Sequence, residues 1–371
     1  MEKERLYYID WLRVLVVLSL IFYHSALTYT GLGSIYIRNP LHDASGLPFL
    51  MIAVPLRSFF MTLLFFVSGI AAYYSLKYRG STRFMGERIR KILIPFVLGT
   101  IILCPIQAYF KALYNGFSGN LINFLPEFFS YKISEYLGYA HLWFLLYLFV
   151  FSLLSLPLFT KWTRNEARLK KITHYLTEGN HIYIPILFIV VTEMILRPFF
   201  PGPQTLIGDW ANDVVYMSVF IYGFVFASDI RLQERVCGLV NLSKVIFFVL
   251  AIVYIVIESL VMLDESRFSA LGLFLDLSKG FYECAAIVFL LWFGKKHFNK
   301  KSPILNYLNK SSFTVYMIHF VPVSMFTYLF MSVEMNVYIR YLLVVLFSYF
   351  FVFIFYELFD KLFLRSRFHK F

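Results

Sequence analysis

The stretch RLYYIDWLRVLVVLSLIFYHS, residues 5–25, opens the first long apolar run and carries two side chains that a membrane helix normally avoids, Arg13 and His24. Ten residues separate these two side chains. On an α-helix a step of eleven residues is about three turns, so both side chains project from nearly the same face. Their separation along the helix axis is roughly 16 Å, about half the thickness of the hydrocarbon core. Asp10, three residues before Arg13, can pair with it.

Composition places this stretch in a membrane protein. The chain has 371 residues, of which 60% are hydrophobic and 15% are charged, and its mean hydropathy is +0.69. A soluble domain of this length could not bury so much apolar surface. The apolar runs are about 20 residues long, which suits membrane helices and exceeds the short alternating strands of a β-barrel. We therefore expect an all-α, polytopic integral membrane protein.

Ten membrane-spanning helices are predicted from the apolar runs. They cover about residues 11–30, 51–76, 92–112, 141–159, 182–199, 214–228, 244–263, 268–293, 312–331 and 338–359. The segments before the first span and after every second span carry most of the 34 Lys and Arg residues. By the positive-inside rule both termini are then cytoplasmic, Arg13 lies at the cytoplasmic end of its span and His24 lies deep in the membrane. No soluble domain is expected, so residues 1–371 are predicted to form one membrane-embedded domain.

Nucleic-acid and metal binding fit the sequence less well. The net charge of +12 would suit nucleic acid, but the charges sit in short loops between apolar runs, as topology determinants do. The three cysteines are scattered and suggest neither a disulfide framework nor a metal knuckle. Three histidines, His24, His141 and His319, lie in or at predicted spans, and none has a partner at metal-ligand spacing. No metal site is predicted.

Several ionisable residues lie within the predicted spans, where an unpartnered charge is costly. Glu193 and Arg197 are spaced as an i,i+4 pair, and Asp276, Lys279 and Glu283 share one helix face at steps of three and four residues. These groups are expected to form internal ion pairs that hold helices together. Alternatively, the face from Asp276 to Glu283 lines a hydrated cavity for a polar acceptor.

The loop after the second predicted span is the most basic in the chain. Its basic residues are Lys77, Arg79, Arg83, Arg88, Arg90 and Lys91, against a single acid, Glu87. Anchoring on the positive side of the membrane is one explanation. Docking of a polyanion, such as the phosphates of coenzyme A, is the other, because the cluster is denser than topology requires.

Short motifs accompany Arg13 and His24 along most of the chain. They are Ile9-Asp10-Trp11-Leu12-Arg13, Tyr23-His24-Ser25, Phe65-Phe66-Val67-Ser68-Gly69, the basic segment running into Pro95, His141-Leu142-Trp143-Phe144-Leu145 and the stretch 316–319. With the basic-X10-His spacing of the first span, they resemble the acyltransferase 3 family of bacterial membrane acyltransferases. The first span and the segment Gly208-Asp209-Trp210 are most similar to the glucan-modification succinyltransferases.

One motif departs from the family pattern. Many members carry Arg-X-X-Arg after the second span, and this chain has Arg88-Ile89-Arg90-Lys91. Lysine keeps the positive charge but lacks the planar fork with which arginine binds a phosphate through two hydrogen bonds.

The resemblance implies catalytic roles for His24 and Arg13 and substrate contacts from other motif residues. Those contacts are expected from Asp10, Ser68, Arg88, Arg90, Lys91, His141, Trp143, Tyr316 and His319. It implies transfer of an acyl group, acetyl or succinyl, from cytoplasmic acyl-CoA to a hydroxyl of a glucan or another cell-envelope carbohydrate. The protein would be a multi-pass protein of the bacterial inner membrane, with no permanently bound cofactor. Its expected partners are the lipid bilayer, acyl-CoA, a carbohydrate acceptor and, in an oligomer, further copies of the chain, but not nucleic acid.

For such a transfer the sequence suggests a division of roles along the first helix. Neutral imidazole can take the proton of a hydroxyl, which makes His24 the expected general base, and an acyl-imidazole intermediate is the other use of that ring. Arg13, roughly 16 Å away, is too far to hold the oxyanion at the same centre. It is expected to contact the donor electrostatically or to pair with Asp10, while Arg88, Arg90 and Lys91 are candidates for the donor phosphates.

Two other functions compete with the enzyme. A transporter or flippase of a polar or glycan substrate would also show ten spans, intramembrane charges and this loop charge pattern. A structural partner within a polysaccharide-export complex would show no turnover. The Arg13–His24 spacing and the basic cytoplasmic cluster favour the acyltransferase.

Overall fold

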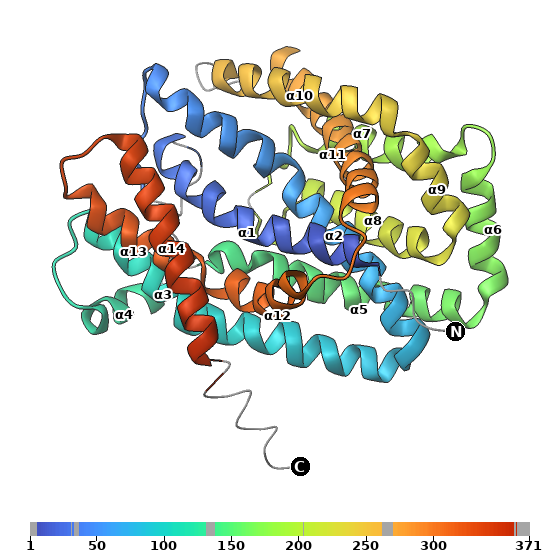
Figure 1. Cartoon of the computed structure of the whole chain (residues 1–371), viewed down its shortest axis with the longest axis horizontal. Coiled ribbons are helices and arrows are strands. Elements are labelled where there is room, and N and C mark those ends of the chain that lie inside the picture. The colour runs from blue at the N-terminus through green and yellow to red at the C-terminus, as the bar shows by residue number, and fades with distance from the viewer. Residues whose placement is uncertain are drawn as a thin grey trace. The chain divides into compact units, whose positions relative to one another are not determined.

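The computed structural model describes residues 6–30, 32, 37–130, 138–202, 204–261, 270–359 and 361, and within these residues the chain forms helices and no strand (Figure 1). The α-helices are α1 (Tyr7–Thr30), α2 (Leu47–Arg88), α3 (Ile94–Tyr114), α4 (Leu121–Phe129), α5 (Trp143–Arg164), α6 (Glu166–Thr177), α7 (Ile184–Leu196), α8 (Trp210–Ser228), α9 (Ile230–Gly238), α10 (Val240–Val261), α11 (Ala270–His297), α12 (Pro303–Ile318), α13 (Phe320–Met331) and α14 (Val337–Phe359). Short 3-10 turns cover Ala44–Gly46, Ala140–Leu142 and His181–Tyr183, and a π-helical turn covers Ile89–Leu93. The expected all-α class is confirmed.

Several of these helices are long and apolar enough to cross a membrane. Among the described residues six segments qualify, and the number rises to eight if each of two bent helix pairs is one span. One bent pair is α6 with the segment His181–Leu196, and the other is α12 with α13. The chain is thus a multi-pass membrane protein. The count of ten spans stays a prediction, and residues 262–269, where two of the predicted spans end and begin, lie outside the described part.

The longest helical segment, Ala44–Tyr114, contains two of the predicted spans. Between them Gly80 has φ 73° and ψ 170°, which is not helical and interrupts α2. Glycine can adopt a positive φ at little steric cost, so the chain turns at Gly80 without ending its helical run. The later of these two spans, the third predicted in the chain, continues as the helix that follows the π-helical turn Ile89–Leu93.

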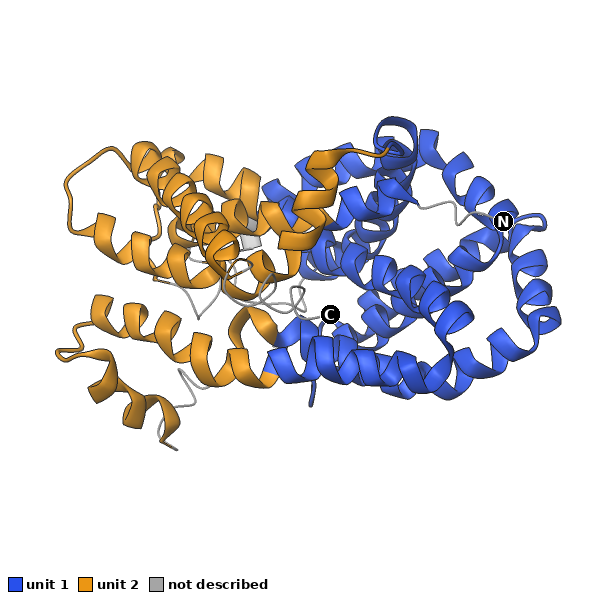
Figure 2. Cartoon of the chain, turned by 60° about the horizontal axis from the view of Figure 1, so that its bottom comes forward, with its two compact units in different colours: residues 1–13, 54–96, 143–300 blue, residues 14–53, 97–142, 301–371 orange. Residues whose placement is uncertain are grey.

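The chain divides into two compact units, coloured separately in Figure 2. Unit 1 contains residues 1–13, 54–96 and 143–300, and unit 2 contains residues 14–53, 97–142 and 301–371. Three helices, α1, α2 and α3, contribute residues to both units. That one domain covers residues 1–371 stays a prediction.

In unit 1 the close crossing of α2 and α8 depends on two glycines. A Cβ atom placed on Gly69 would lie 2.0 Å from the carbonyl oxygen of Phe220, and one on Gly223 would lie 2.0 Å from that of Phe66. No side chain fits at such a distance, so both positions need glycine. The last residue of the motif Phe65–Gly69 is therefore explained by packing.

In unit 2, α14 is joined to α1 by tyrosine hydroxyls. Tyr341 donates to the carbonyl oxygen of Phe22 at 3.2 Å, and Tyr349 donates to that of Leu18 at 2.6 Å. Both acceptors lie on α1 within two turns of His24. These bonds hold the part of α1 that carries the histidine.

The bend between α12 and α13 also has a local cause. The two helices meet at His319 at an angle of 57°. Pro322 has no N–H for the carbonyl of Ile318 four residues earlier, and its ring clashes with that carbonyl, which breaks the helix at this point. As a result, His319 occupies the corner of a broken helix.

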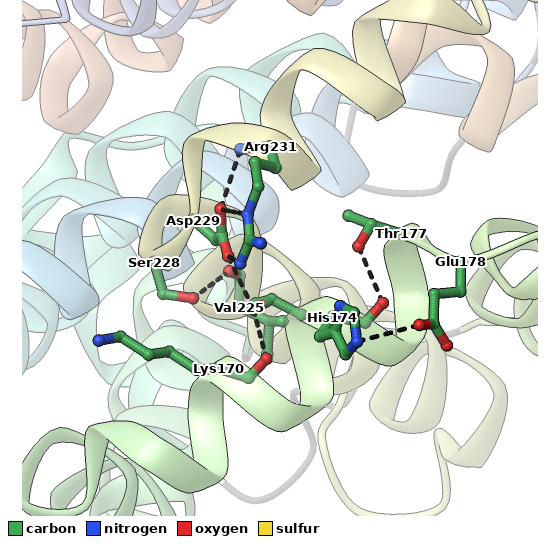
Figure 3. Close-up of polar contacts among 9 residues, drawn as sticks. Lys170, His174, Thr177, Glu178, Val225, Ser228, Asp229 and Arg231 are labelled. Carbon is green, nitrogen blue, oxygen red and sulfur yellow. Dashed lines mark hydrogen bonds and ion pairs between the residues drawn. The ribbon is translucent and has the colours of Figure 1, made fainter.

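A polar corner joins α6, α8 and α9 in unit 1 (Figure 3). Asp229 lies just before α9 and accepts hydrogen bonds from the backbone N–H of Arg231 at 2.9 Å and from the hydroxyl of Thr173 at 3.0 Å. The Arg231 guanidinium lies 2.7 Å from the same carboxylate. These contacts hold the pKa of Asp229 down to about 2, with the hydrogen bonds of Arg231 as the main cause. Asp229 therefore links three helices at one point.

Candidate functional site

Three histidines meet in unit 2, and they are the three that the sequence places in or at membrane spans. The ring of His319 lies 5.1 Å from that of His24 and 4.8 Å from that of His141, between centroids. Phe320 packs against both outer rings, 5.0 Å from His24 and 5.5 Å from His141. All three imidazoles are buried: the exposed fraction is 5% for His24, 5% for His141 and 0% for His319. We call His24, His141 and His319 the histidine cluster.

Backbone carbonyls decide the tautomers of two of these rings. Nε2 of His141 lies 3.0 Å from the carbonyl oxygen of Met317, and Nδ1 of His319 lies 2.7 Å from that of Tyr316. A carbonyl oxygen only accepts, so each of these nitrogens must carry the proton. The other nitrogens, Nδ1 of His141 and Nε2 of His319, are then unprotonated. They are buried and have no hydrogen-bond partner among the described residues.

Tyr316 contributes to the cluster through the backbone. Its hydroxyl donates to the carbonyl oxygen of His141 at 2.7 Å, and its own carbonyl accepts from His319. It thereby connects the turn Ala140–Leu142 to the broken helix α12–α13. Gly99 packs against both of these segments, because a Cβ atom on it would lie 2.7 Å from Leu142 and 2.7 Å from Met317. Tyr316 therefore positions the cluster rather than lending it a free hydroxyl.

At the start of α1, Arg13 forms the ion pair expected from its spacing. Nη2 of Arg13 lies 3.0 Å from Oδ1 of Asp10. Helix α1 runs without interruption from Tyr7 to Thr30, so the axial step between Arg13 and His24 is that of a regular helix, roughly 16 Å. The expectation that these two groups do not act on the same atom is consistent with this geometry.

The basic residues of α2 and the π-helical turn surround one carboxylate in unit 1. Glu87 lies 2.6 Å from Arg79, 3.6 Å from Arg83 and 3.7 Å from Lys91. Arg88 stacks over the ring of Phe84, with 4.7 Å between its guanidinium carbon and the ring centroid. Arg90 and Lys91 lie exposed on the π-helical turn, a rare element that often marks functional sites.

A groove beside this cluster was not predicted from the sequence. It has a volume of about 540 Å³. Its lining, contributed by α2, α5, α6 and the residue between α5 and α6, is Ser81, Leu156, Pro157, Thr160, Lys161, Arg164, Asn165 and Arg168. Three of these side chains are basic, and no acidic side chain is among the described residues that line it. The signal was present in the sequence as the next basic loop, but the sequence does not show that the two loops face each other.

Two further predicted contact residues lie in unit 1. Ser68 is half-buried on α2, next to the glycine that packs against α8. Trp143 is buried at the start of α5, where its ring stacks on Tyr216 at 5.9 Å between centroids and meets Tyr147 edge-on at 5.3 Å. His141 belongs to unit 2 and Trp143 to unit 1, so the motif His141–Leu145 is shared between the two units.

The charges within the predicted spans form a buried network in unit 1. Arg197 binds Glu193 through two hydrogen bonds of 2.6 and 2.7 Å, and Lys279 binds the same carboxylate. Lys279 also lies 3.2 Å from Glu283. The expected pairs Glu193–Arg197 and Lys279–Glu283 are confirmed, while a pair between Asp276 and Lys279 stays a prediction. The contact between Lys279 and Glu193 joins α7 and α11. The sequence spacing could predict only the pairs within one helix.

Metal binding finds no support in this geometry. Within the described residues no group of three or more His, Cys, Asp or Glu side chains is arranged to hold a metal ion. That the protein binds no metal stays a prediction.

Comparison with known families agrees with the sequence motifs. A family model described as an acyltransferase domain, that of acyltransferase family 3, matches residues 6–357, nearly the whole chain. No curated protein and no solved structure matches the chain.

Proposed function

Because the chain belongs to the acyltransferase 3 family, we propose that it is a membrane O-acyltransferase that moves an acetyl or succinyl group from cytoplasmic acyl-CoA to a carbohydrate hydroxyl. The acceptor is a glucan or another cell-envelope carbohydrate, and the membrane is the inner membrane of a bacterium. The histidine cluster carries the proposal. It offers buried, unprotonated ring nitrogens to a hydroxyl in an otherwise apolar setting, as general-base catalysis requires.

In the proposed reaction His24 acts as the general base. Its imidazole takes the proton of the acceptor hydroxyl, and the resulting alkoxide attacks the thioester carbonyl. The tetrahedral intermediate collapses, the carbon–sulfur bond breaks, and the imidazolium returns the proton to the departing coenzyme A thiolate. An acyl-imidazole on His24 is the two-step version of the same transfer.

His141 and His319 support His24 in this mechanism. Each has one nitrogen held by a backbone carbonyl, so its ring keeps one orientation while the other nitrogen can accept a hydrogen bond. We propose that these nitrogens accept hydrogen bonds from the acceptor hydroxyl or its neighbours before transfer. Tyr316 fixes the distance between the two segments that carry them.

The donor phosphates are proposed to bind at the basic surface of unit 1. Arg88, Arg90 and Lys91 were the candidates from the sequence, and the groove with Lys161 and Arg164 adds cations to that surface. Positive side chains, hydroxyls and an asparagine amide are the groups that bind phosphate oxygens. With ten spans and both termini in the cytoplasm, this surface would face the pool of acyl-CoA.

Transfer by the purified protein tests this function. The protein in liposomes is given acetyl-CoA or succinyl-CoA with a radioactive acyl group, together with a glucan acceptor. The proposal predicts that label appears on the glycan as an alkali-labile ester, in step with release of free coenzyme A. Movement of glycan across the bilayer without ester formation would instead favour the transporter, and neither signal would contradict both functions.

A further inference from the structure

A second polar site lies within unit 1, and its lining includes none of the residues assigned above to acyl transfer. It is a cavity of about 130 Å³ among α2, α7, α8, α10 and α11. The lining includes Arg57, Arg197, Asn212, Tyr216, Asp276 and Lys279. A polar, partly open cavity among apolar helices is unusual, because ionisable side chains in such helices are costly unless they serve a purpose.

The charges around this cavity balance each other. Arg197 and Lys279 are both neutralised by Glu193, and Lys279 also by Glu283. Asp276 adds a negative group to the lining and Arg57 a positive one. Three carboxylates would repel an anion in the cavity, and three basic groups would repel a cation. The cavity therefore favours a neutral ligand with many hydrogen-bonding groups.

The remaining lining suits a hydroxyl-bearing ring. Asn212 and Gln204 supply amides, which both donate and accept, and Tyr216 and Tyr254 supply rings and hydroxyls. The volume of about 130 Å³ is close to the roughly 150 Å³ of an engineered cavity that binds one six-membered carbon ring. A hexose has about twice as many heavy atoms as that carbon ring, so one sugar ring would fill the cavity and extend through its open side. The mixture of polar and aromatic groups suits such a ring.

The backbone at Gln204, which forms one wall of the cavity, and at nearby Leu206 is held in a strained conformation. Gln204 has φ 62° and Leu206 has φ 64°, left-handed values that are rare for residues other than glycine. Buried Asp209 holds this wall by accepting hydrogen bonds from the backbone N–H of Gln204 at 3.1 Å and from Asn212 at 3.0 Å. Strained backbone that is held by many contacts clusters at ligand sites. The segment Gly208–Trp210 thus has a structural role at the cavity rather than one in the histidine cluster.

We propose that this cavity binds one neutral sugar ring of the carbohydrate acceptor. That the bound ring belongs to the acceptor rests on the proposed function. That the ligand is a neutral, hydroxylated ring rests on the cavity alone. Ring hydroxyls would donate hydrogen bonds to the Asp276 carboxylate and exchange them with the Asn212 amide, and the ring would pack against Tyr216 or Tyr254.

Saturation-transfer NMR with methyl β-glucoside tests the site. The full-length protein is studied in lipid nanodiscs without sugar-based detergents, whose head groups would occupy the cavity. Ser58→Phe places a large ring in the cavity, since Ser58 lines it, and Asp276→Asn changes one polar partner at constant shape. Ser130→Phe, at an exposed position, is the matched control. Thermal unfolding checks that each variant is folded.

The proposal predicts a saturable signal that falls at least about tenfold in Ser58→Phe, a loss of about 1.4 kcal/mol in binding free energy. The signal falls less in Asp276→Asn and is unchanged in Ser130→Phe. No saturable signal, a signal equal in the wild type and both cavity variants, or displacement by sulfate or choline would overturn it. Binding without acyl transfer by the wild type would leave the sugar site standing and remove the proposed function.

Discussion

At the scale of single residues, one backbone contact decides what each supporting histidine can do. His141 gives its Nε2 proton to Met317, and His319 gives its Nδ1 proton to Tyr316, so one nitrogen of each ring is left unprotonated. A ring held in this way cannot exchange its two nitrogens without losing a buried hydrogen bond, which costs about 1–3 kcal/mol. His141 and His319 each thus present one fixed hydrogen-bond acceptor nitrogen.

Glu193 is the residue whose loss unit 1 should tolerate least. Glu193→Ala leaves Arg197 and Lys279 without their shared carboxylate in a buried position, and breaking a buried pair in this way costs about 3–5 kcal/mol. We expect a marked fall in the thermal unfolding midpoint and in the yield of folded protein. Glu178→Ala, which removes an exposed carboxylate 2.9 Å from His174, is the control and should change stability by less than about 0.5 kcal/mol. Equal stability of the two variants would contradict the network's role.

At the scale of helices, apolar pattern determines where the helices form, while glycines and one proline determine where they bend, break or cross closely. The sequence predicted the helices well because runs of about 20 apolar residues have few alternatives in a membrane. It could not predict that Gly80 interrupts the helical run of α2 with a kink or that His319 lies at a corner, because both depend on the local backbone. The sequence also could not predict that His24, His141 and His319 lie together, because residues far apart in sequence are brought together only by tertiary packing.

Gly69 provides a direct test of the α2–α8 crossing. Gly69→Ala puts a methyl group where the Phe220 carbonyl oxygen lies 2.0 Å away, and overpacking of this kind typically costs 1–3 kcal/mol or more. Gly86→Ala on the same helix is the matched control, because no described atom lies within 4 Å of its added Cβ. That control should be neutral or stabilising by up to about 1 kcal/mol. Thermal unfolding in detergent measures both, and a stable Gly69→Ala variant would show that the crossing is looser than described.

The corner at Asp229 should make stability depend on pH in the acid range. The folded pKa is about 2, below the ordinary value of 3.8, so the charged carboxylate stabilises the fold above pH 3.8. This contribution is lost as pH falls through about 2. Asp229→Asn should therefore unfold at a lower temperature than the wild type at pH 6, and the difference should shrink between pH 4 and pH 2. A difference that stays constant over this range would show that charge is not its cause.

At the scale of the whole molecule, one chain carries two compact units with different chemistry. Unit 2 holds the histidine cluster, while unit 1 holds the basic surface, the ionic network and the sugar-sized cavity. Helix α1 belongs to both units, with Arg13 in unit 1 and His24 in unit 2. Under the proposed function the basic surface binds the donor, the cavity binds the acceptor ring and His24 is the base.

The central claim is that acyl transfer depends on His24 within the histidine cluster. The most direct measurement is the initial rate of label transfer from radioactive acyl-CoA to glycan for purified wild type, His24→Ala and His174→Ala, the last removing an exposed histidine outside the cluster. We predict that His24→Ala loses at least about 100-fold in rate, as expected for removal of a general base, while it unfolds at the wild-type temperature and His174→Ala keeps full activity. Transfer by folded His24→Ala at the wild-type rate would contradict the claim.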